Sequence, residues 1–277
     1  MQYFSNPIVD VIKSRKSVRS YSDKPLASEI KKKIIDYIDT IKCPFENEVK
    51  IILLDKATDG ENGAKIGTYG MIKGAKHFLA AIIQIDDIYS YVQLGFKLEQ
   101  LILFATDLSL GTVWLGGTFN KGQFSKAANL APNEIIPIVS PIGFQSEKKS
   151  FIEKLMRKSS NGDNRKAREE LFFNDSFNKP LERSKAEKFE VALEMLRLAP
   201  SAMNAQPWRI IKENNNFNFY NSKPSMKMHD IDMGICMCHF ELTLKEAEIK
   251  GSWKIQKPVI QDTPKNYDYI ISWCEEQ

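Results

Sequence analysis

The strongest constraint on the fold is an order of features that occurs twice along the chain. In each half, a Lys-Pro-Leu triplet precedes a predicted helix, a glycine then opens a long helix, a second glycine closes it, and a tryptophan follows. Trp114 and Trp253 have the same separation along the chain as the opening glycines Gly95 and Gly234, and we call this separation the repeat offset. A repeated order of this kind predicts an internal duplication, in which each copy is one unit of helix and sheet.

The spacing of apolar residues predicts the elements of both copies. In the first copy we expect helices at 7–12, 28–41 and 91–108, and strands at 49–54, 77–85, 112–115 and 135–142. In the second copy we expect a helix at Ser184, where Glu187 would complete a capping box. A strand at 209–211 and a final strand at 267–273, pairing across the copies, complete the prediction.

These elements imply an α+β fold with two similar helix-flanked sheets, mixed or antiparallel, that arose by internal duplication. We place the first copy at 1–145, a charged connection at 146–176 and the second copy at 177–277. The 277 residues provide enough chain for one large core or two smaller ones.

Composition argues against several classes of protein. The net charge of +4 is small, and basic residues mostly alternate with acidic ones, so we expect no nucleic-acid partner. No apolar run approaches the roughly 20 residues of a membrane helix, and the N-terminus has no apolar signal core. Four scattered cysteines are too few for a disulfide framework, so the expected location is the cytoplasm.

A metal site is also not expected. The string Cys236-Met237-Cys238-His239 lies in a predicted helix, where residues two apart diverge by about 200°. A zinc site needs four converging ligands, and the sequence has no second cluster of Cys and His. Core packing is therefore our interpretation of this string.

Three segments carry candidate chemistry, and the first is Arg15-Lys16-Ser17-Val18-Arg19. In an extended chain Arg15, Ser17 and Arg19 point the same way. Two guanidinium groups and a hydroxyl on one side suit a phosphate or another anion. The alternative is an ordinary solvated basic cluster.

The second segment runs from Ala199 to Trp208 and has the sequence Ala-Pro-Ser-Ala-Met-Asn-Ala-Gln-Pro-Trp. Two prolines stiffen it, and Ser201, Asn204 and Gln206 supply donors and acceptors. A plain helix-to-strand loop is the alternative. In the third segment, Gly116 and Gly117 follow a predicted strand and permit close backbone approach to a flat ligand, although a simple turn would look the same.

Together these three segments resemble the FMN-dependent nitroreductase family, in particular its single-chain, internally duplicated branch. Ordinary members form homodimers with two FMN sites, and each site takes one segment from each subunit. Here Glu170, Phe172 and Asn174 stand where the Arg-x-Ser-x-Arg segment would recur, and 43–47 stands where the Pro-Ser-x-x-Asn loop would recur. The resemblance therefore implies a fused pseudo-dimer with one complete site.

The resemblance also implies roles for individual residues. Arg15, Lys16, Ser17 and Arg19 would hold the phosphate, ribityl and pyrimidine side of FMN, and the Gly116 N–H would face flavin N5 with Gly117 beside it. The remaining predicted cofactor-binding residues are Pro200, Ser201 and Asn204 across the interface, Tyr69 and Lys73 beside the isoalloxazine, and Lys166 and Arg168 on the phosphate. A solvated linker is the alternative for the run at 165–168.

The implied activity is NAD(P)H-driven, ping-pong reduction of nitroaromatic or quinone-type acceptors. The chemistry would belong to the flavin, with no obligatory protein acid or base. Arg19 and Gly116 would tune the flavin, and Arg19 or Lys73 could stabilise its anionic reduced form. The alternative is an FMN-binding carrier or sensor without turnover, which reduction by NADH or NADPH would distinguish. The expected partner is a small-molecule acceptor, and the expected assembly is a monomer or weak homodimer.

Overall fold

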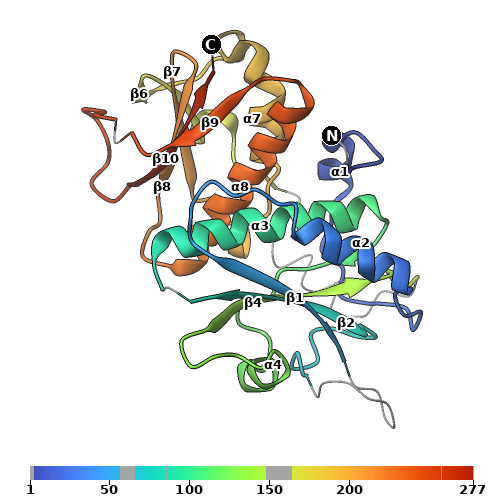
Figure 1. Ribbon diagram of the computed structural model, residues 1–277. Helices are drawn as coiled ribbons and strands as arrows, with labels where there is room; N and C mark the ends of the chain where they lie inside the picture. Colours follow the sequence, from blue (N-terminus) through green and yellow to red (C-terminus); the bar gives the residue numbers. More distant parts are fainter. Residues whose placement is uncertain (1–2, 57–65, 85, 148–163, 257, 277) are drawn as a thin grey trace.

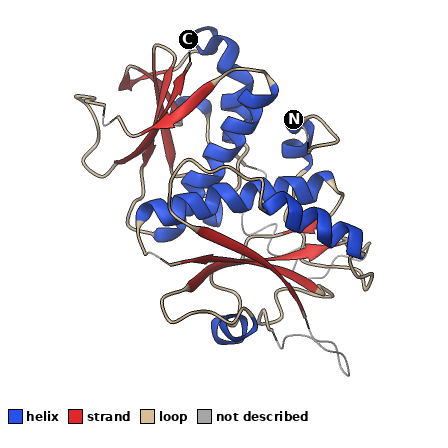
Figure 2. Ribbon diagram, in the orientation of Figure 1, coloured by secondary structure: helices blue, strands red, loops and turns tan. Residues whose placement is uncertain are grey.

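The computed structural model describes residues 3–56, 66–84, 86–147, 164–256 and 258–276, and it arranges them as two β-sheets on either side of a layer of helices (Figure 1). Figure 2 shows the same layering by secondary structure, with one short helix on the outer face of the first sheet. The predicted α+β class with two helix-flanked sheets is confirmed.

Among the described residues, the first half of the chain supplies four helices and a four-stranded antiparallel sheet. Its helices are α1 (Ile8–Ser14), α2 (Ser28–Ile38), α3 (Ile88–Asp107) and α4 (Lys121–Ala127). Its strands are β1 (Val49–Asp55), β2 (His77–Ile83), β3 (Gly111–Thr112) and β4 (Ile135–Gly143), in the order β1-β2-β4-β3.

The position of strand β2 in the fold explains its apolar sequence, because every residue of the strand is buried. Leu79 and Ala81 face the large core beneath the helices, whereas Phe78 and Ala80 face a second core that contains Phe124 of α4. A strand covered on both faces needs a continuous apolar run rather than an alternating one.

The second half has a six-stranded sheet in the order β6-β5-β7-β8-β10-β9. Its strands are β5 (Phe172–Asn174), β6 (Ser176–Pro180), β7 (Trp208–Glu213), β8 (Asn216–Asn221), β9 (Gly251–Lys254) and β10 (Asp268–Glu275). Its α-helices are α6 (Arg183–Ala186), α7 (Glu190–Arg197) and α8 (Lys227–Glu246), and short 3-10 turns cover Arg168–Glu170, Glu187–Phe189 and Ala202–Asn204. The order β7-β8-β10-β9 repeats, element for element, the order β1-β2-β4-β3 of the first sheet.

Helices α3 and α8 form the centre of the molecule and cross at two glycines. Both helices have 20 residues, and their first residues are separated by the repeat offset. A Cβ atom on Gly95 would collide with the carbonyl of Ile231, and one on Gly234 would collide with the carbonyl of Val92. Val92 and Ile231 are separated by the same offset, so the crossing has approximate two-fold symmetry, which supports the duplication. The prediction that each glycine opens its helix is wrong, because both lie inside and permit close contact.

Two further predictions need correction. The helix expected at Ser184 is the four-residue α6, and Glu187 adopts a left-handed φ of 52°, so no Ser184–Glu187 capping box forms. Strand β10 pairs with β8 and β9 of its own sheet rather than across the copies. The chain crosses at β5 instead, which follows the first copy and pairs in parallel with β7.

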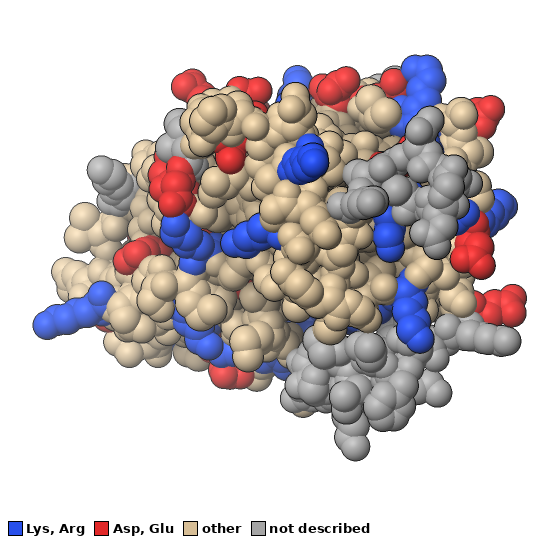
Figure 3. Space-filling view, turned by 90° about the horizontal axis from the view of Figure 1, so that it is seen from below, with Lys and Arg blue, Asp and Glu red and all other residues tan. Residues whose placement is uncertain are grey.

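The charged connection predicted at 146–176 is therefore not wholly a linker, since β5 is an internal strand of the second sheet. Residues 148–163 of that connection lie outside the described residues. On the face shown in Figure 3, basic and acidic side chains are interspersed rather than gathered by sign. Within the described ranges, none of the helices combines the length and the apolar character of a membrane span.

Candidate functional site

The Arg-x-Ser-x-Arg segment begins where α1 ends and runs extended beside two other predicted site segments. Ser17 bridges to Thr112, and Ser20 bridges to Lys73. The N–H of Lys73 donates to the carbonyl of Arg19 at 2.9 Å. Ser17, Arg19 and Lys73 are therefore brought together through backbone pairing, next to the strand that leads into Gly116.

Burial alternates from Ser17 to Ser20, as expected for an extended backbone, but this alternation does not include Lys16. Val18 and Ser20 are buried, whereas Ser17 is exposed and Arg15 and Arg19 are partly exposed. The predicted grouping of two guanidinium groups and a hydroxyl on one side is consistent with this pattern. Lys16 is exposed.

Arg15 lies at the junction of the two halves, because α1 contacts α3, α7 and α8. Part of its side chain is accessible, yet its Nη1 atom is buried and finds no hydrogen-bond acceptor among the described residues. Burial lowers the pKa of the guanidinium, and the nearby Glu99 carboxylate opposes that effect. A buried donor without an acceptor is costly, so the site is suited to an additional acceptor group.

Glu99 of α3 is fully buried and connects the two halves. One carboxylate oxygen accepts the indole N–H of Trp114 at 3.0 Å, and the other lies 2.9 Å from Nε2 of His239 in α8. Nδ1 of His239 lies 2.9 Å from the carbonyl of Met195. Both ring nitrogens of His239 thus face oxygen atoms, one in each half of the molecule.

The loop after α7 is the most strained part of the described backbone. Met203, Asn204 and Gln206 all adopt left-handed φ values, of 50°, 55° and 46°. Such values are uncommon for residues other than glycine, and they cluster where the surrounding structure holds a functional conformation. The Ser201 hydroxyl accepts the N–H of Gln206 at 2.9 Å, which closes the loop.

A residue that the sequence analysis missed anchors this loop. Asp232 of α8 accepts the N–H of Ala202 on Oδ1 at 2.9 Å. Its counterpart in the first half at the repeat offset, Gln93 of α3, binds the N–H of Phe45 at 2.9 Å and the carbonyl of Asn47 at 2.7 Å. The same helix position therefore holds the equivalent loop in both halves, and two buried polar residues separated by the repeat offset are the signal that could have found it.

The two anchors differ in one respect. Gln93 uses both ends of its amide, whereas Oδ2 of Asp232 is buried and makes no hydrogen bond within the described structure. Burial raises the pKa of Asp232 to about 8. The carboxyl is therefore largely protonated near neutral pH.

The basic run at 165–168 lies against the same loop. Arg165 donates to Oδ1 of Asn204 at 3.1 Å and to the carbonyl of Leu198 at 3.0 Å. The backbone N–H of Lys166 donates to Oε1 of Gln206 at 2.8 Å. Burial, and then the nearby positive charge of Arg209, lower the pKa of Lys166.

Arg168 is placed differently from Lys166. It is buried, its Nη2 lies 2.7 Å from Oε2 of Glu190, and its guanidinium covers the ring of Phe172 at 5.2 Å. The Arg168 side chain is therefore not part of a solvated linker. Its contact with the FMN phosphate stays a prediction. Pro200 and Asn204 are partly exposed, and the Asn204 amide already has protein partners in Arg165 and Gln206.

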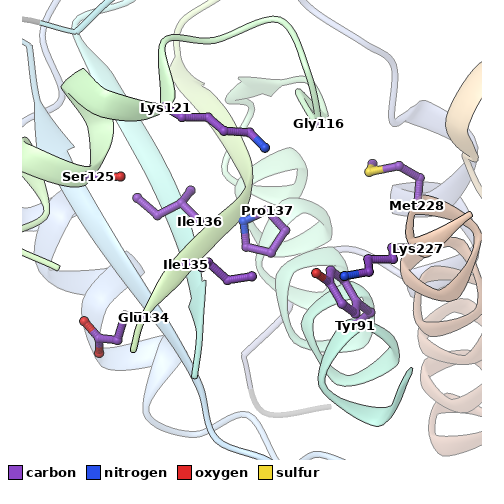
Figure 4. A pocket seen from close by; sticks show the side chains of 10 residues that line it. All are labelled: Tyr91, Gly116, Lys121, Ser125, Glu134, Ile135, Ile136, Pro137, Lys227 and Met228. Carbon is purple, nitrogen blue, oxygen red and sulfur yellow. The ribbon is translucent and has the colours of Figure 1, made fainter. Parts of the chain in front are cut away.

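The glycine segment lies beside the start of β4. Leu115 exchanges backbone hydrogen bonds of 3.0 Å with Val139, and Gly116 lies against the side chain of Met228 at the start of α8. Gly117 is exposed, with open space where a side chain would be. A cavity of about 320 Å³ opens at Gly116 (Figure 4). Tyr69 is 70% exposed, and Lys73 is exposed as well.

Comparison with known proteins identifies the family of a chain with this arrangement. Residues 7–244 match the family model described as "Putative TM nitroreductase". The chain belongs to this family. The nitroreductase fold is shown independently by a Thermotoga maritima protein described as a "putative nitroreductase", which has a TM-score of 0.60 at 18% identity and matches over 98% of this chain and 93% of its own.

Partial matches to other solved nitroreductases are weaker. An "FMN-dependent Nitroreductase" of Clostridium difficile R20291 is 17% identical over 50% of this chain and 88% of its own, with a TM-score of 0.40. A "Putative NADH dehydrogenase/NAD(P)H nitroreductase" of Parabacteroides distasonis is 19% identical over 53% of this chain and 91% of its own, with a TM-score of 0.40. Comparison with curated proteins gives no match.

Family membership identifies the chain as an oxidoreductase of the nitroreductase type. Within this nitroreductase, the string that resembles metal ligands has other contacts. Cys236 donates to the carbonyl of Met233, and Cys238 is fully buried. Burial raises the pKa of both thiols, and His239 is engaged with Glu99 and Met195.

Proposed function

We propose that this nitroreductase holds one FMN between its two halves and uses NAD(P)H to reduce small nitroaromatic or quinone-type acceptors. The observation that carries the proposal is the buried Nη1 of Arg15, which lacks an acceptor within the described residues at the junction of the halves. In the same segment, Ser17 bridges to Thr112, and the carbonyl of Arg19 accepts the N–H of Lys73. A flavin phosphate or carbonyl is the kind of acceptor that such a cationic edge is suited to bind.

A second observation supports an anionic ligand. Lys166 and Arg209 lie close enough for the charge of Arg209 to lower the pKa of Lys166. Like charges gathered beside a strained loop favour an anion that relieves their repulsion. We assign the phosphate to this basic region and to Arg15, and the loop residues Ser201 and Asn204 to the wall of the same site.

The proposed stoichiometry of one FMN per chain is supported by strand β5. Its residue Phe172 occupies the position that corresponds to Ser17, yet it is fully buried and pairs with Ile210 of β7. The segment that would build a second site is therefore part of a sheet. In the first half, Gln93 fixes the corresponding loop with three hydrogen bonds to Phe45 and Asn47.

When bound, FMN would accept a hydride from NAD(P)H and pass two electrons to the acceptor, for example converting a nitro group to a nitroso group with uptake of two protons and loss of water. The residues of the chain would bind the flavin and tune its reduction. Arg19 or Lys73 supplies positive charge where negative charge develops on reduction, and the Gly116 N–H is our choice for the donor opposite the reacting edge. Glu99 positions Trp114, two residues before Gly116, from the interior of the helix pair.

The test is an absorbance spectrum of the purified protein with flavin quantified per chain, followed by anaerobic titration with NADH and NADPH. We expect one FMN per chain and loss of the oxidised flavin band upon titration. Two flavins per chain would refute the single-site model. One flavin that neither nucleotide reduces would favour the carrier or sensor.

A further inference from the structure

The cavity at Gly116 lies where the two halves meet. Its walls come from the glycine segment, from α4 and the start of β4, and from the first turns of α3 and α8 (Figure 4). At about 320 Å³ it is at the small end of the range for ligand pockets, large enough for a single-ring compound. Ile136, Pro137 and Met228 give it apolar surface.

The charges around the cavity are unevenly compensated. Lys227 is paired with Asp86, with Nζ 2.6 Å from a carboxylate oxygen, and it covers the ring of Tyr91 at 5.5 Å. The Glu134 carboxylate accepts the N–H of Ala131 at 2.9 Å and points away from the cavity (Figure 4). The negative charges near the cavity are thus directed elsewhere or already paired.

Lys121 differs from Lys227, because its positive charge is not paired within the described structure. It is the first residue of α4, it is exposed, and it makes no ion pair or hydrogen bond with the described part of the chain. Figure 4 shows its side chain extending from α4 into the space in front of Gly116 and Pro137. The cavity therefore combines an apolar slot with one cation that has no partner among the described residues.

We propose that this cavity binds the electron acceptor, and that the acceptor is a flat ring that carries an anionic group, such as a carboxylate, held by Lys121. The inference rests on the proposed function, since it takes Gly116 as the residue beside the flavin. The ring would lie between Pro137 and Met228, with the anionic group toward α4. Lys121 contributes charge alone: the hydride comes from NAD(P)H and the protons from solvent.

The same chemistry could come from the phosphates of the nicotinamide nucleotide, so the experiment separates the two sources. The probes are 4-nitrobenzoate and 4-nitrobenzamide, which are similar in size and differ in charge. Binding of each to the FMN-loaded protein is measured by calorimetry without NAD(P)H, and KM for each probe and for NADH and NADPH is measured under turnover. The variants are Lys121→Gln, Lys121→Arg, and Lys126→Gln as a control on the same helix but outside the cavity.

We expect Lys121→Gln to weaken nitrobenzoate binding about three- to tenfold and to change nitrobenzamide binding less than about twofold, because an exposed lysine is partly screened by solvent. Lys121→Arg should retain the preference for the anion, and Lys126→Gln should behave as the wild type. Equal weakening of both probes would overturn the proposal. A raised KM for NADPH with unchanged nitrobenzoate binding would assign Lys121 to the nucleotide and would also overturn it.

Failure of the proposed function would look different. If neither nucleotide reduces the bound flavin, the enzyme assignment fails, while the calorimetric comparison still decides whether Lys121 selects an anionic ring.

Discussion

At the scale of single residues, Arg15 combines a place at the junction of the halves with the binding role that we propose for it. Its charge is balanced from the interior by Glu99, and Glu99 also holds Trp114 and His239. The donor on Nη1 remains unused in the described structure. A side chain that is already partly buried at the junction loses less entropy when a ligand binds than a free surface arginine would.

Replacing Arg15 with Gln should therefore weaken FMN binding far more than riboflavin binding. A charge-assisted hydrogen bond contributes about 1.5–3 kcal/mol, or about ten- to a hundredfold in affinity, and riboflavin lacks the phosphate that would accept it. Fluorescence titration of the apoprotein with both flavins measures the difference. Lys13→Gln, an exposed substitution on the same helix, is the control. Equal losses for FMN and riboflavin would mean that Arg15 does not contact the phosphate.

Asp232 gives a prediction about pH. Its pKa is raised from 3.8 to about 8, so between these values the unfolded chain loses a proton that the folded chain keeps. The contribution of Asp232 to the free energy of unfolding is therefore fully present below pH 4. It falls as the pH rises toward 8, by up to about 1.4 kcal/mol per pH unit. Urea unfolding at several pH values should show a flatter profile for Asp232→Asn than for the wild type. Asp10→Asn, at an exposed position, should leave the slope unchanged, and a wild-type slope in Asp232→Asn would contradict the shift.

The sequence alone could identify candidate site residues that belong to short motifs. It could not identify the buried residues that hold those motifs in place. Arg15, Ser17 and Ser201 belong to short local patterns, so the sequence itself marks them as candidates. Glu99 and Asp232 act on partners far away in the sequence, and neither belongs to a string that marks it. Their roles depend on the crossing of α3 and α8, which no local pattern specifies.

At the scale of elements, the crossing of α3 and α8 depends on the absence of two side chains. In an isolated helix, Gly→Ala would stabilise by about 1 kcal/mol. At Gly95 the added Cβ would meet the carbonyl of Ile231, and the same holds for Gly234 and Val92. Backbone cannot move aside as a flexible side chain can, so overpacking should prevail.

Gly95→Ala should accordingly lower the free energy of unfolding by about 1–3 kcal/mol, as measured by urea denaturation. Gly122→Ala in α4 is the matched control, because its Cβ would meet only the Asn120 side chain, at 3.7 Å. That control should be neutral or slightly stabilising. If Gly95→Ala stabilised the protein as much as the control does, the close approach of the helices would be wrong.

The elements that the sequence predicts carry a long apolar signal, and those that it misses do not. Helix α3 repeats its apolar residues at helical spacing, and strand β2 is one continuous apolar run, so the sequence locates both of them. Helix α4 buries only Phe124, and β6 is half-buried at best, so neither has a pattern to detect. Strand β8 alternates Asn with Phe only from Asn216 to Phe219, because Tyr220 breaks the pattern, and the polar residues on both flanks weaken the signal further.

At the scale of the whole molecule, the chain has two similar halves, whereas the site that we propose is asymmetric. The two sheets share a strand order, and α3 and α8 share a length and are related by the repeat offset. The asymmetry lies in the segments between them. One half offers the Arg15–Arg19 segment and the other offers the strained 200–206 loop, while the counterpart segments are committed to β5 and to the Gln93 contacts. A fused chain can lose one of two interface sites without losing the fold, because each remaining segment still packs on the same helix pair.

This organisation predicts that neither half binds FMN well alone. A chain cut between Glu147 and Asn164 keeps each sheet intact, since β5 remains with β7. The first half would retain Arg15 but lose α7 and α8, against which α1 packs, and the second would retain Ser201 without the cationic edge. A flat ligand exposed on one side loses much of the burial that holds it. Each separate half should therefore bind at least about tenfold more weakly than the intact chain, because it lacks one charge-assisted contact set.

The measurement is flavin binding by the halves, alone and together. Coexpressed halves should copurify with FMN, and flavin fluorescence should change when separately purified halves are mixed. Coexpression also limits aggregation of the apolar α3 and α8 faces, which each half would otherwise expose. A soluble first half that binds FMN as tightly as the whole chain would show that the 200–206 loop contributes nothing to the site.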